Sequence, residues 1–323
     1  MTNFEVEVRE LSFENRRVQN LNAFQVQETD KNINVQSVVS LQHCTVPNLT
    51  ASDVFRDVMF QLDELHISIK RGILGYDSDD LYSMAAMRTF PAHLVSDWLA
   101  PASEKLKALS IYDEENWGPL PGYFDASSLS FPNLRSLALG FYTLAYDGDI
   151  NWILRMRSLC RLILHNCMIA SWIAIAEDDK SLWDPPMDGW THITDYQENG
   201  LVELYSYNGT WAQAFDRIAA SLPNLIDFRF DMGVTWWFAI QCMPAGRHRY
   251  GFAHRDSTGT IIHPLRYTYI DRSPFPWNNE RDDGDLEAWL ISHAAVSENK
   301  DVTQMKGDQT SLDILMEVLR ARK

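Results

Sequence analysis

The stretch Leu159–Ile169, LCRLILHNCMI, decides the fold that this sequence predicts. It follows the spacing L-x-x-L-x-L-x-x-N/C-x-L, in which Leu162 and Leu164 flank one residue and Cys167 takes the Asn/Cys position. Alternate residues of a short strand face the same side, so both leucines are expected to point inward. A single coil of this kind cannot bury its apolar face alone, and it therefore needs similar coils stacked against it.

Similar stretches recur along the chain. Counted from the first position of the pattern, which is apolar in every copy except at Gln36, they start at 36, 62, 106, 134, 159, 201 and 225. The successive differences are 26, 44, 28, 25, 42 and 24 residues, so four of the six fit one leucine-rich repeat and two fit a repeat with an insertion. The copy at Leu201 and Leu204 is poor. Unrelated buried strands are the alternative interpretation, but the period favours stacked repeats.

Helical patterns precede several of these strands. Apolar residues at helical spacing occupy 52–62, 93–100, 149–156 and 210–220, with Thr210 as an expected N-cap. Helix, turn and strand therefore alternate along the chain. This order predicts an α/β leucine-rich-repeat solenoid, a horseshoe with a parallel sheet on its concave face, helices outside and an irregular C-terminal cap.

The repeat pattern divides the chain into three parts. Residues 1–35 are expected to form an N-terminal cap or a degenerate first repeat, because the end of a solenoid would otherwise expose its core. Residues 36–235 are the expected solenoid, and residues 236–323 an expected C-terminal capping region. The elements predicted in this last part are a hairpin turn at 256–259, two helices at 285–295 and 311–322, and a mobile connector at 296–310.

Composition narrows the classes of partner. The net charge of -16 over 323 residues argues against nucleic acid and anionic membranes. It is compatible with a basic protein partner, and ordinary solubility explains it equally well. The sequence has no run of 18 apolar residues, its N-terminus lacks the apolar core of a secretion signal, and its four cysteines form no C-x-x-C pair. We therefore expect an intracellular protein, cytoplasmic or nuclear, with reduced cysteines.

Motifs of common enzyme chemistry are missing from the sequence. No phosphate-binding or nucleophile-elbow glycine motif occurs. His254-Arg-Asp256 imitates a kinase catalytic loop, but Ile261 stands where that loop requires Asn. The carboxylates Asp147 and Asp149 do not fit a calcium loop, and helix capping is the simpler explanation for Asp149. We expect no catalytic residue, no metal and no cofactor, and hence no enzyme.

Outward positions of the expected strands are candidates for protein binding, as are the tryptophans of the insertion at 170–200. Exposed Trp and Tyr side chains dominate the energetics of many interfaces. The alternative for the tryptophans is that they fold back over the edge of the solenoid. The candidate residues are Tyr112, Phe141, Arg161, His165, Trp183, Trp190, Tyr205 and Arg229.

The irregular repeats FPNLRSL, at 131–137, and LCRLILHNCMI resemble the leucine-rich region of fungal F-box proteins over about residues 5–235. In that family an N-terminal F-box binds a Skp1-type adaptor of a cullin-type ubiquitin ligase, and the repeats select the substrate. The resemblance implies a protein–protein interaction module that acts as a substrate receptor. Residues 1–35 contain no F-box pattern, so adaptor binding is expected only if an F-box exists upstream.

Two alternatives to the receptor role stay open. The first is a repeat scaffold that has no connection with ubiquitin. The second is a carboxylate-based hydrolase that uses the acidic and Trp-rich loops at 177–190 and 277–285, which would need two carboxylates facing each other across a cleft.

Overall fold

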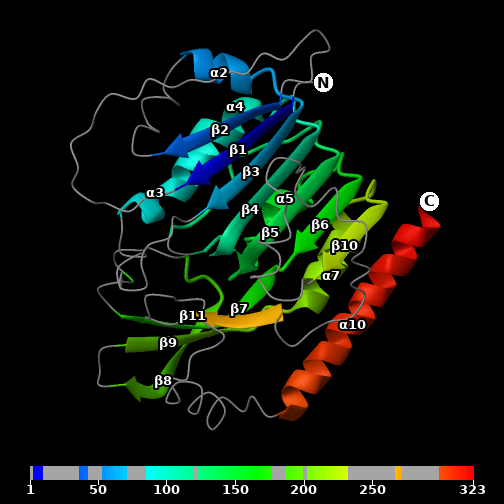
Figure 1. Ribbon diagram of the computed structural model, residues 1–323. Helices are drawn as coiled ribbons and strands as arrows, with labels where there is room; N and C mark the ends of the chain where they lie inside the picture. Colours follow the sequence, from blue (N-terminus) through cyan, green and yellow to red (C-terminus); the bar gives the residue numbers. More distant parts are fainter. Residues whose placement is uncertain are drawn as a thin grey trace.

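A mixed sheet with few helices forms the framework of the protein, as seen in a computed structural model (Figure 1). Within the residues that the structure describes, eleven strands belong to this sheet. The predicted hairpin turn at 256–259 and the predicted helix at 285–295 lie outside the described residues. The described residues are 3–9, 36–42, 53–70, 85–119, 122–176, 180, 186–198, 202–231, 266–270 and 298–323.

Seven strands form a parallel array in the order β2-β1-β3-β4-β5-β6-β10. Leu65, Leu109, Leu137, Leu162 and Phe228 are paired in register across five of them, and each is at most 4% exposed. This leucine file is the centre of the main core. The strands are β1 (Asn3–Arg9), β2 (Gln36–Gln42), β3 (Glu64–Lys70), β4 (Ala108–Trp117), β5 (Ser136–Leu144), β6 (Arg161–His165) and β10 (Asp227–Asp231).

The sheet continues from β5 into a second part with antiparallel pairing. β7 (Met168–Ala176) pairs with the end of β5 and with β11 (Tyr267–Ile270) in parallel. β9 (Val202–Tyr207) pairs with β7 and with β8 (Trp190–Glu198) in antiparallel orientation. The β8–β9 hairpin therefore extends the sheet away from the parallel array, as Figure 1 shows.

A shared bend separates the two parts of the sheet. β5 pairs with β6 as far as Gly140 and His165, and pairing resumes between Thr143 of β5 and Met168 of β7. Phe141 and Asn166 follow those last paired residues, and both adopt left-handed backbone conformations, with φ of 60° and 50°. Because non-glycine residues rarely adopt positive φ, two such residues at matched positions mark a turn that both segments make together.

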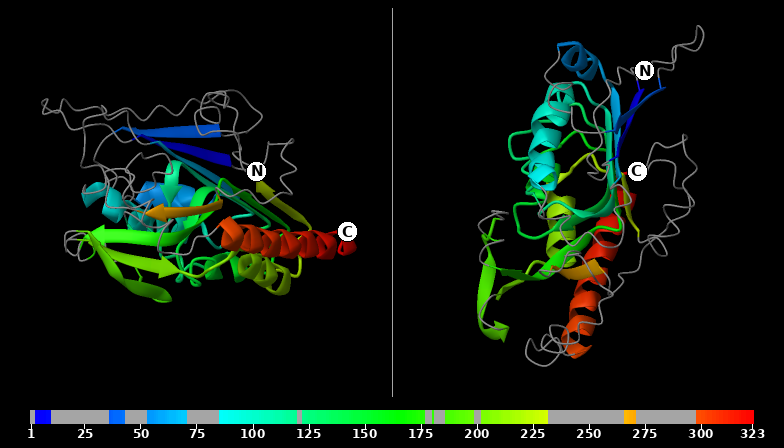
Figure 2. Two further views of the ribbon diagram at one scale, coloured as in Figure 1. Left: turned by 90° about the horizontal axis from the view of Figure 1, so that it is seen from below. Right: turned by 60° about the vertical axis from the view of Figure 1, so that its left-hand side comes forward.

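The helices lie mostly on one side of the sheet (Figure 2). Their aromatic residues pack on the leucine file, among them Phe55, Trp98 and Phe215, which are at most 6% exposed. The predicted N-cap of α7 is confirmed, since Thr210 and Gln213 form a capping box. The helices are α2 (Asp53–Met59), α3 (Ala85–His93), the π-helix η2 (Leu94–Leu99), α4 (Ala100–Ala102), α5 (Asn151–Leu154), α7 (Trp211–Ser221) and α10 (Glu298–Ala321).

The predicted helix-outside leucine-rich-repeat solenoid is wrong. A solenoid stacks its coils in chain order, whereas β1 lies between β2 and β3, and β10 returns to pair with β6. The antiparallel strands β8 and β9 also break the expected parallel sheet.

The expected outer layer of one helix per repeat is missing from the described residues between β4 and β6. Residues 122–135 are irregular, and α5 is only four residues long. Aromatic side chains fill this space, because Trp117, Phe124, Tyr142 and Trp152 pack ring against ring at centroid distances of 4.8 to 6.3 Å. Rings from the ends of β4 and β5, from the short helix α5 and from the irregular segment at 122–135 thus cover the core where helices were expected.

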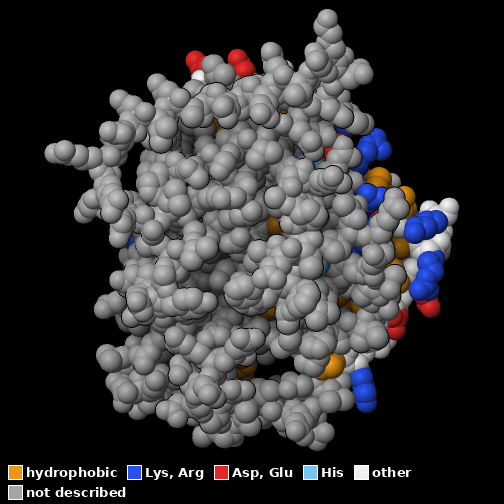
Figure 3. Space-filling model, viewed as in Figure 1, with side chains coloured by type: hydrophobic (Ala, Val, Ile, Leu, Met, Phe, Trp, Pro, Cys, Tyr) orange, Lys and Arg blue, Asp and Glu red, His pale blue; other side chains and the backbone are white. Residues whose placement is uncertain are grey.

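The predicted mobile connector at 296–310 is also wrong in its described part. Residues 298–321 form the single helix α10, so the predicted helix at 311–322 is the second half of a longer one. Leu312, Leu315 and Leu319 of α10 are buried in the main core. Lys, Arg and hydrophobic side chains lie close together along the edge of the molecule where α10 and β10 are found (Figure 3).

α10 binds both ends of α7. At the N-terminus of α7, Asp308 Oδ1 accepts a hydrogen bond of 2.8 Å from the Ala212 N–H. At its C-terminus, Arg322 donates to the carbonyls of Ala219 and Leu222 at 2.9 and 2.8 Å. A carboxylate at the N-terminus and a guanidinium at the C-terminus both complement the helix dipole. The two helices therefore run parallel and hold each other in place.

Candidate protein-binding site

The β8–β9 hairpin carries a row of aromatic side chains on one face. Trp190 of β8 is paired with Tyr207 of β9, and His192 with Tyr205. Alternation along each strand places all four side chains, here called the aromatic row, on the same side of the hairpin. The rings of Trp190 and Tyr207 are 5.6 Å apart at 31°, and those of His192 and Tyr205 are 5.0 Å apart at 34°.

A turn and a small core hold the aromatic row in position. The turn before β8 is closed by a 3.1 Å hydrogen bond from Trp190 N–H to the Met187 carbonyl, and Gly189 in it has φ of 83°, a conformation that suits glycine. Ile173 and Ile175 of β7 are buried with Tyr205 in a second core, against which Trp190 packs. Packing therefore fixes the positions of Tyr205 and Trp190 in the aromatic row.

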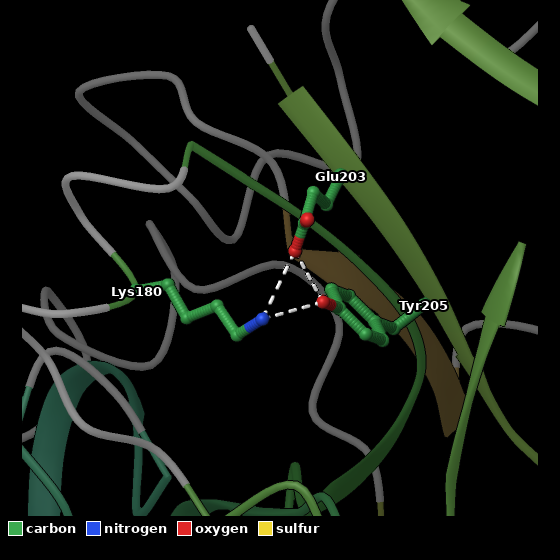
Figure 4. A network of polar contacts seen from close by, with 3 residues as sticks. All are labelled: Lys180, Glu203 and Tyr205. Atoms are coloured by element: carbon green, nitrogen blue, oxygen red, sulfur yellow. Dashed lines mark hydrogen bonds and ion pairs between the residues drawn. The ribbon is translucent and has the colours of Figure 1, made fainter. Parts of the chain in front are cut away.

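A network of three polar groups lies beside the aromatic row (Figure 4). The Lys180 ammonium donates to Glu203 Oε2 at 3.0 Å and to the Tyr205 hydroxyl at 2.6 Å, and the Tyr205 hydroxyl donates to Glu203. Lys180 Nζ also lies 5.0 Å from the centre of the Tyr205 ring, a distance typical of a cation–π contact. One cation thus contacts a carboxylate, a hydroxyl and an aromatic ring.

The electrostatics of this network keep its groups in their ordinary charge states. Hydrogen bonds from Tyr205 and Lys180 lower the pKa of Glu203, and those with Tyr205 and Glu203 raise the pKa of Lys180. Burial, followed by the hydrogen bond to Glu203, raises the pKa of the Tyr205 hydroxyl. Tyr205 is therefore a neutral phenol at neutral pH, and the network lacks an activated nucleophile or base. Its chemistry suits recognition.

Exposure decides which of these side chains a partner could reach. His192 is exposed, and Trp190 and Tyr207 are half-buried. The side chains of Lys180 and Glu203 are 31% and 34% exposed. Each of these five side chains is therefore at least partly exposed to solvent, where a partner could contact it.

An acidic turn between β5 and α5 borders the aromatic row. Asp147 is exposed, and its Oδ1 accepts a 2.7 Å hydrogen bond from the Tyr207 hydroxyl. Asp149 is buried, and its Oδ2 accepts bonds from the N–H groups of Ala145 and Tyr146 at 2.5 and 3.1 Å. Helix capping does not explain Asp149 as predicted, because the N-cap of α5 is Ile150. Asp149 instead holds the turn that positions Asp147.

The structure brings two of the predicted binding residues together and places the other described ones elsewhere. Trp190 and Tyr205 share the aromatic row, although the sequence placed one in an insertion and the other on a repeat strand. Trp183 lies outside the described residues. Tyr112 and His165 are 5% and 6% exposed, on the face of the parallel array opposite the leucine file.

The remaining predicted residues lie on or next to that opposite face. The ring of Phe141, at the bend in β5, is 6.4 Å from the ring of His165. Arg161 and Arg229 both contact Asp227, at 2.8 and 3.5 Å. Their side chains are 40% and 26% exposed, so they offer a smaller and self-paired charged surface at the β6–β10 end of the sheet.

Sequence reasoning missed Lys180, His192, Glu203 and Tyr207. The segments WTHIT and VELYSY are rich in β-branched and aromatic residues, which favour strands. That signal could have identified the two strands of the hairpin. It could not have identified Lys180, whose partners lie 23 and 25 residues away along the chain.

One other arrangement has the residue types of a hydrolase. His66 Nδ1 is hydrogen-bonded to Ser110 Oγ at 2.7 Å, and its Nε2 lies 3.6 Å from Glu64 Oε2. Ser110 and His66 are 0% and 2% exposed, so no substrate can reach the hydroxyl in this structure. We interpret the pair as cross-strand packing between β3 and β4. The hydrolase loops expected at 177–190 and 277–285 lie mostly outside the described residues.

No further class of site is found in the described part of the chain. It contains no group of three or more His, Cys, Asp or Glu side chains placed to hold a metal ion. None of its helices combines the length and apolar character needed to cross a membrane. Comparisons of the sequence with models of known families, with curated proteins and with solved structures find no match.

Proposed function

We propose that this chain is a protein-binding module that contacts its partner with the aromatic row of the β8–β9 hairpin. The observation that carries the proposal is the half-exposed pair Trp190–Tyr207, held on a packed base beside the exposed His192. Trp and Tyr offer large contact areas with few rotatable bonds, so little conformational entropy is lost when a partner covers them.

The Lys180–Glu203 pair supports this function in a different way. Exposed ion pairs contribute little to folding stability, so the stability of the hairpin does not require this one. Charges fixed at the border of an apolar contact instead set the orientation of a partner and disfavour partners with mismatched charge. The pair is fixed by three contacts, which suits that role.

A role as a substrate receptor of a cullin-type ubiquitin ligase is a narrower form of the proposal. Its support is the sequence resemblance alone. Copurification of the tagged chain with a Skp1-type adaptor would favour the receptor role, and a partner complex free of the adaptor would favour a scaffold unrelated to ubiquitin.

The proposal is tested with a partner captured from cell extract by crosslinking, identified, and then purified. Trp190→Ala is expected to weaken its binding by about tenfold to thirtyfold, because aromatic hot spots contribute roughly 2 kcal/mol or more. The matched control is Phe60→Ala, which removes a ring that is 54% exposed beside α2. Thermal melting of both variants shows whether folding is unaffected.

A second pair of variants separates the hairpin from the other candidate surface. Arg161→Ala combined with Arg229→Ala removes the exposed cations of the β6–β10 end of the sheet. If this double variant weakens binding and Trp190→Ala does not, the hairpin is not the binding site.

A further inference from the structure

The two ring pairs of the aromatic row differ in their charged neighbours. The His192–Tyr205 pair has a cation of its own, since Lys180 Nζ lies 5.0 Å from the Tyr205 ring centre and 3.0 Å from the Glu203 carboxylate. The chain thus contains one complete example of a cation bound between an aromatic ring and a carboxylate.

The Trp190–Tyr207 pair has carboxylates but no cation over its rings among the described residues. Asp147 accepts a hydrogen bond from the Tyr207 hydroxyl, and Asp188 is exposed in the turn that leads into Trp190. The guanidinium of Arg217 contacts the same turn, since it donates to the Asp147 carbonyl at 2.8 Å and to Asn151. Arg217 is therefore occupied by the turn that carries Asp147.

Two more rings widen this surface. Tyr123 and Tyr146 are half-buried, with ring centres 5.6 Å apart. Burial, Asp149 and Asp188 together raise the pKa of the Tyr146 hydroxyl, so the Asp188 charge acts close to that ring. The resulting acidic aromatic patch consists of Tyr123, Tyr146, Asp147, Asp188, Trp190 and Tyr207.

We propose that the acidic aromatic patch binds a Lys or Arg side chain from a basic segment of the protein partner. The cation lies over the Trp190 ring and pairs with Asp147 and Asp188, as Lys180 does with Tyr205 and Glu203. This proposal rests on the protein-binding function proposed above, and it adds the chemistry of the partner.

Three physical effects favour this partner. Indole is the best of the aromatic rings for cation–π contacts. Asp147 is bonded to the Tyr207 hydroxyl and Asp188 lies two residues before Trp190, so two exposed carboxylates at this pair can attract the same cation. The net charge of -16 draws basic segments toward the molecule and repels acidic ones.

The proposal is tested with a defined peptide, labelled acetyl-Gly-Arg-Gly-Arg-Gly-amide, and its counterpart with neutral citrulline in place of arginine. Fluorescence anisotropy with the full chain measures both affinities. We expect the arginine peptide to bind about tenfold more tightly, from one cation–π contact and one or two ion pairs.

Three variants locate the binding. Asp147→Asn combined with Asp188→Asn should remove most of the tenfold preference and its salt dependence, while an amide oxygen can still accept from Tyr207. Trp190→Leu should lower the affinity for the arginine peptide by a similar factor. The matched control is Glu317→Gln, which removes an exposed carboxylate on α10 and should leave binding unchanged.

The outcomes separate this proposal from the proposed function. Equal affinity for the arginine and citrulline peptides overturns the basic partner. The purified partner gives a second test. If Trp190→Ala weakens its binding but the Asp147→Asn and Asp188→Asn double variant does not, the basic partner is also overturned, while the protein-binding function stands. If Trp190→Ala leaves partner binding unchanged, the proposed function itself fails.

Discussion

Asp149 is buried in the turn after β5, where its carboxyl group accepts hydrogen bonds from the N–H groups of Ala145 and Tyr146. Burial raises its pKa from 3.8 to about 8, although hydrogen bonds from two backbone N–H groups act in the opposite direction. The folded protein therefore holds a proton at Asp149 that the unfolded chain has released at neutral pH.

This proton makes stability depend on pH with a definite sign. The pKa of Asp149 is higher in the folded protein than in the unfolded chain, so its contribution to the free energy of unfolding is fully present below about pH 4. This contribution is lost as pH rises to about 8, by about 1.4 kcal/mol for each pH unit. Asp149→Asn keeps an acceptor for both N–H groups and cannot titrate. Urea unfolding across this pH range should show a falling free energy of unfolding in the parent and not in the variant. If the free energy of unfolding depends equally on pH in both proteins, Asp149 is not the titrating group.

The leucine file provides a second prediction for single residues. Leu137 and Leu162 are both 0% exposed and paired with each other across β5 and β6. Leu137→Ala or Leu162→Ala should each lower the free energy of unfolding by about 2 to 5 kcal/mol, as at other buried leucines. The control is Ile226→Ala, next to the file but 40% exposed, expected to change stability by less than about 0.5 kcal/mol.

Single residues were predictable where local spacing determines their environment. Leu162 and Cys167 were expected inside from their positions in the repeat pattern, and both are buried. Lys180 and Glu203 were not predictable, because their contacts depend on the pairing of β9 with β7 and β8. Phe141 was expected outward on a regular strand; instead it lies at the bend that interrupts β5, with φ of 60°, and its ring is 6.4 Å from that of His165.

At the scale of elements, the contact between α7 and α10 makes a specific prediction. Arg322 donates hydrogen bonds to three carbonyls at and beyond the C-terminus of α7, at 2.8 to 3.3 Å. Arg322→Met retains the aliphatic part of the side chain and removes these bonds. A hydrogen bond from a charged group is worth roughly 1.5 to 3 kcal/mol, and these three share one partly exposed guanidinium, so we expect a total loss of about 2 kcal/mol in unfolding free energy.

The matched control for Arg322 is two residues away on the same helix. Arg320 is exposed, so Arg320→Met changes the net charge equally and touches no α7 carbonyl. Chemical denaturation should separate the two variants. If both lose the same free energy, charge and helix propensity explain the effect, and the hydrogen bonds to α7 do not.

Elements with a capping residue were predicted better than elements without one. α7 was found because Thr210 starts it and Leu222-Pro-Asn ends it. Only the second half of α10 was predicted as a helix, because residues 296–310 were interpreted as a connector. Asp308 is 0% exposed and contacts both Ala212 and Tyr267, so contacts between distant segments keep this stretch helical.

At the scale of the whole molecule, the sequence predicted the register of the core strands but not their order. The spacing of Leu109, Leu137 and Leu162 is a local property, and these residues are aligned as expected. The placement of β1 between β2 and β3, and the antiparallel hairpin, depend on long-range pairing that a repeat period does not encode. The same pairing assembles the candidate site.

The net charge of -16 leads to a last prediction, about the kinetics of partner binding. Charge on the whole molecule speeds encounter with a basic partner, whereas packing on the Trp190 ring slows its departure. Raising the salt concentration from about 50 to about 300 mM should therefore lower the association rate by about tenfold or more and change the dissociation rate little. Trp190→Ala should raise the dissociation rate and change the association rate little. Surface plasmon resonance with the purified partner measures both rates, and an association rate independent of salt would contradict a basic partner.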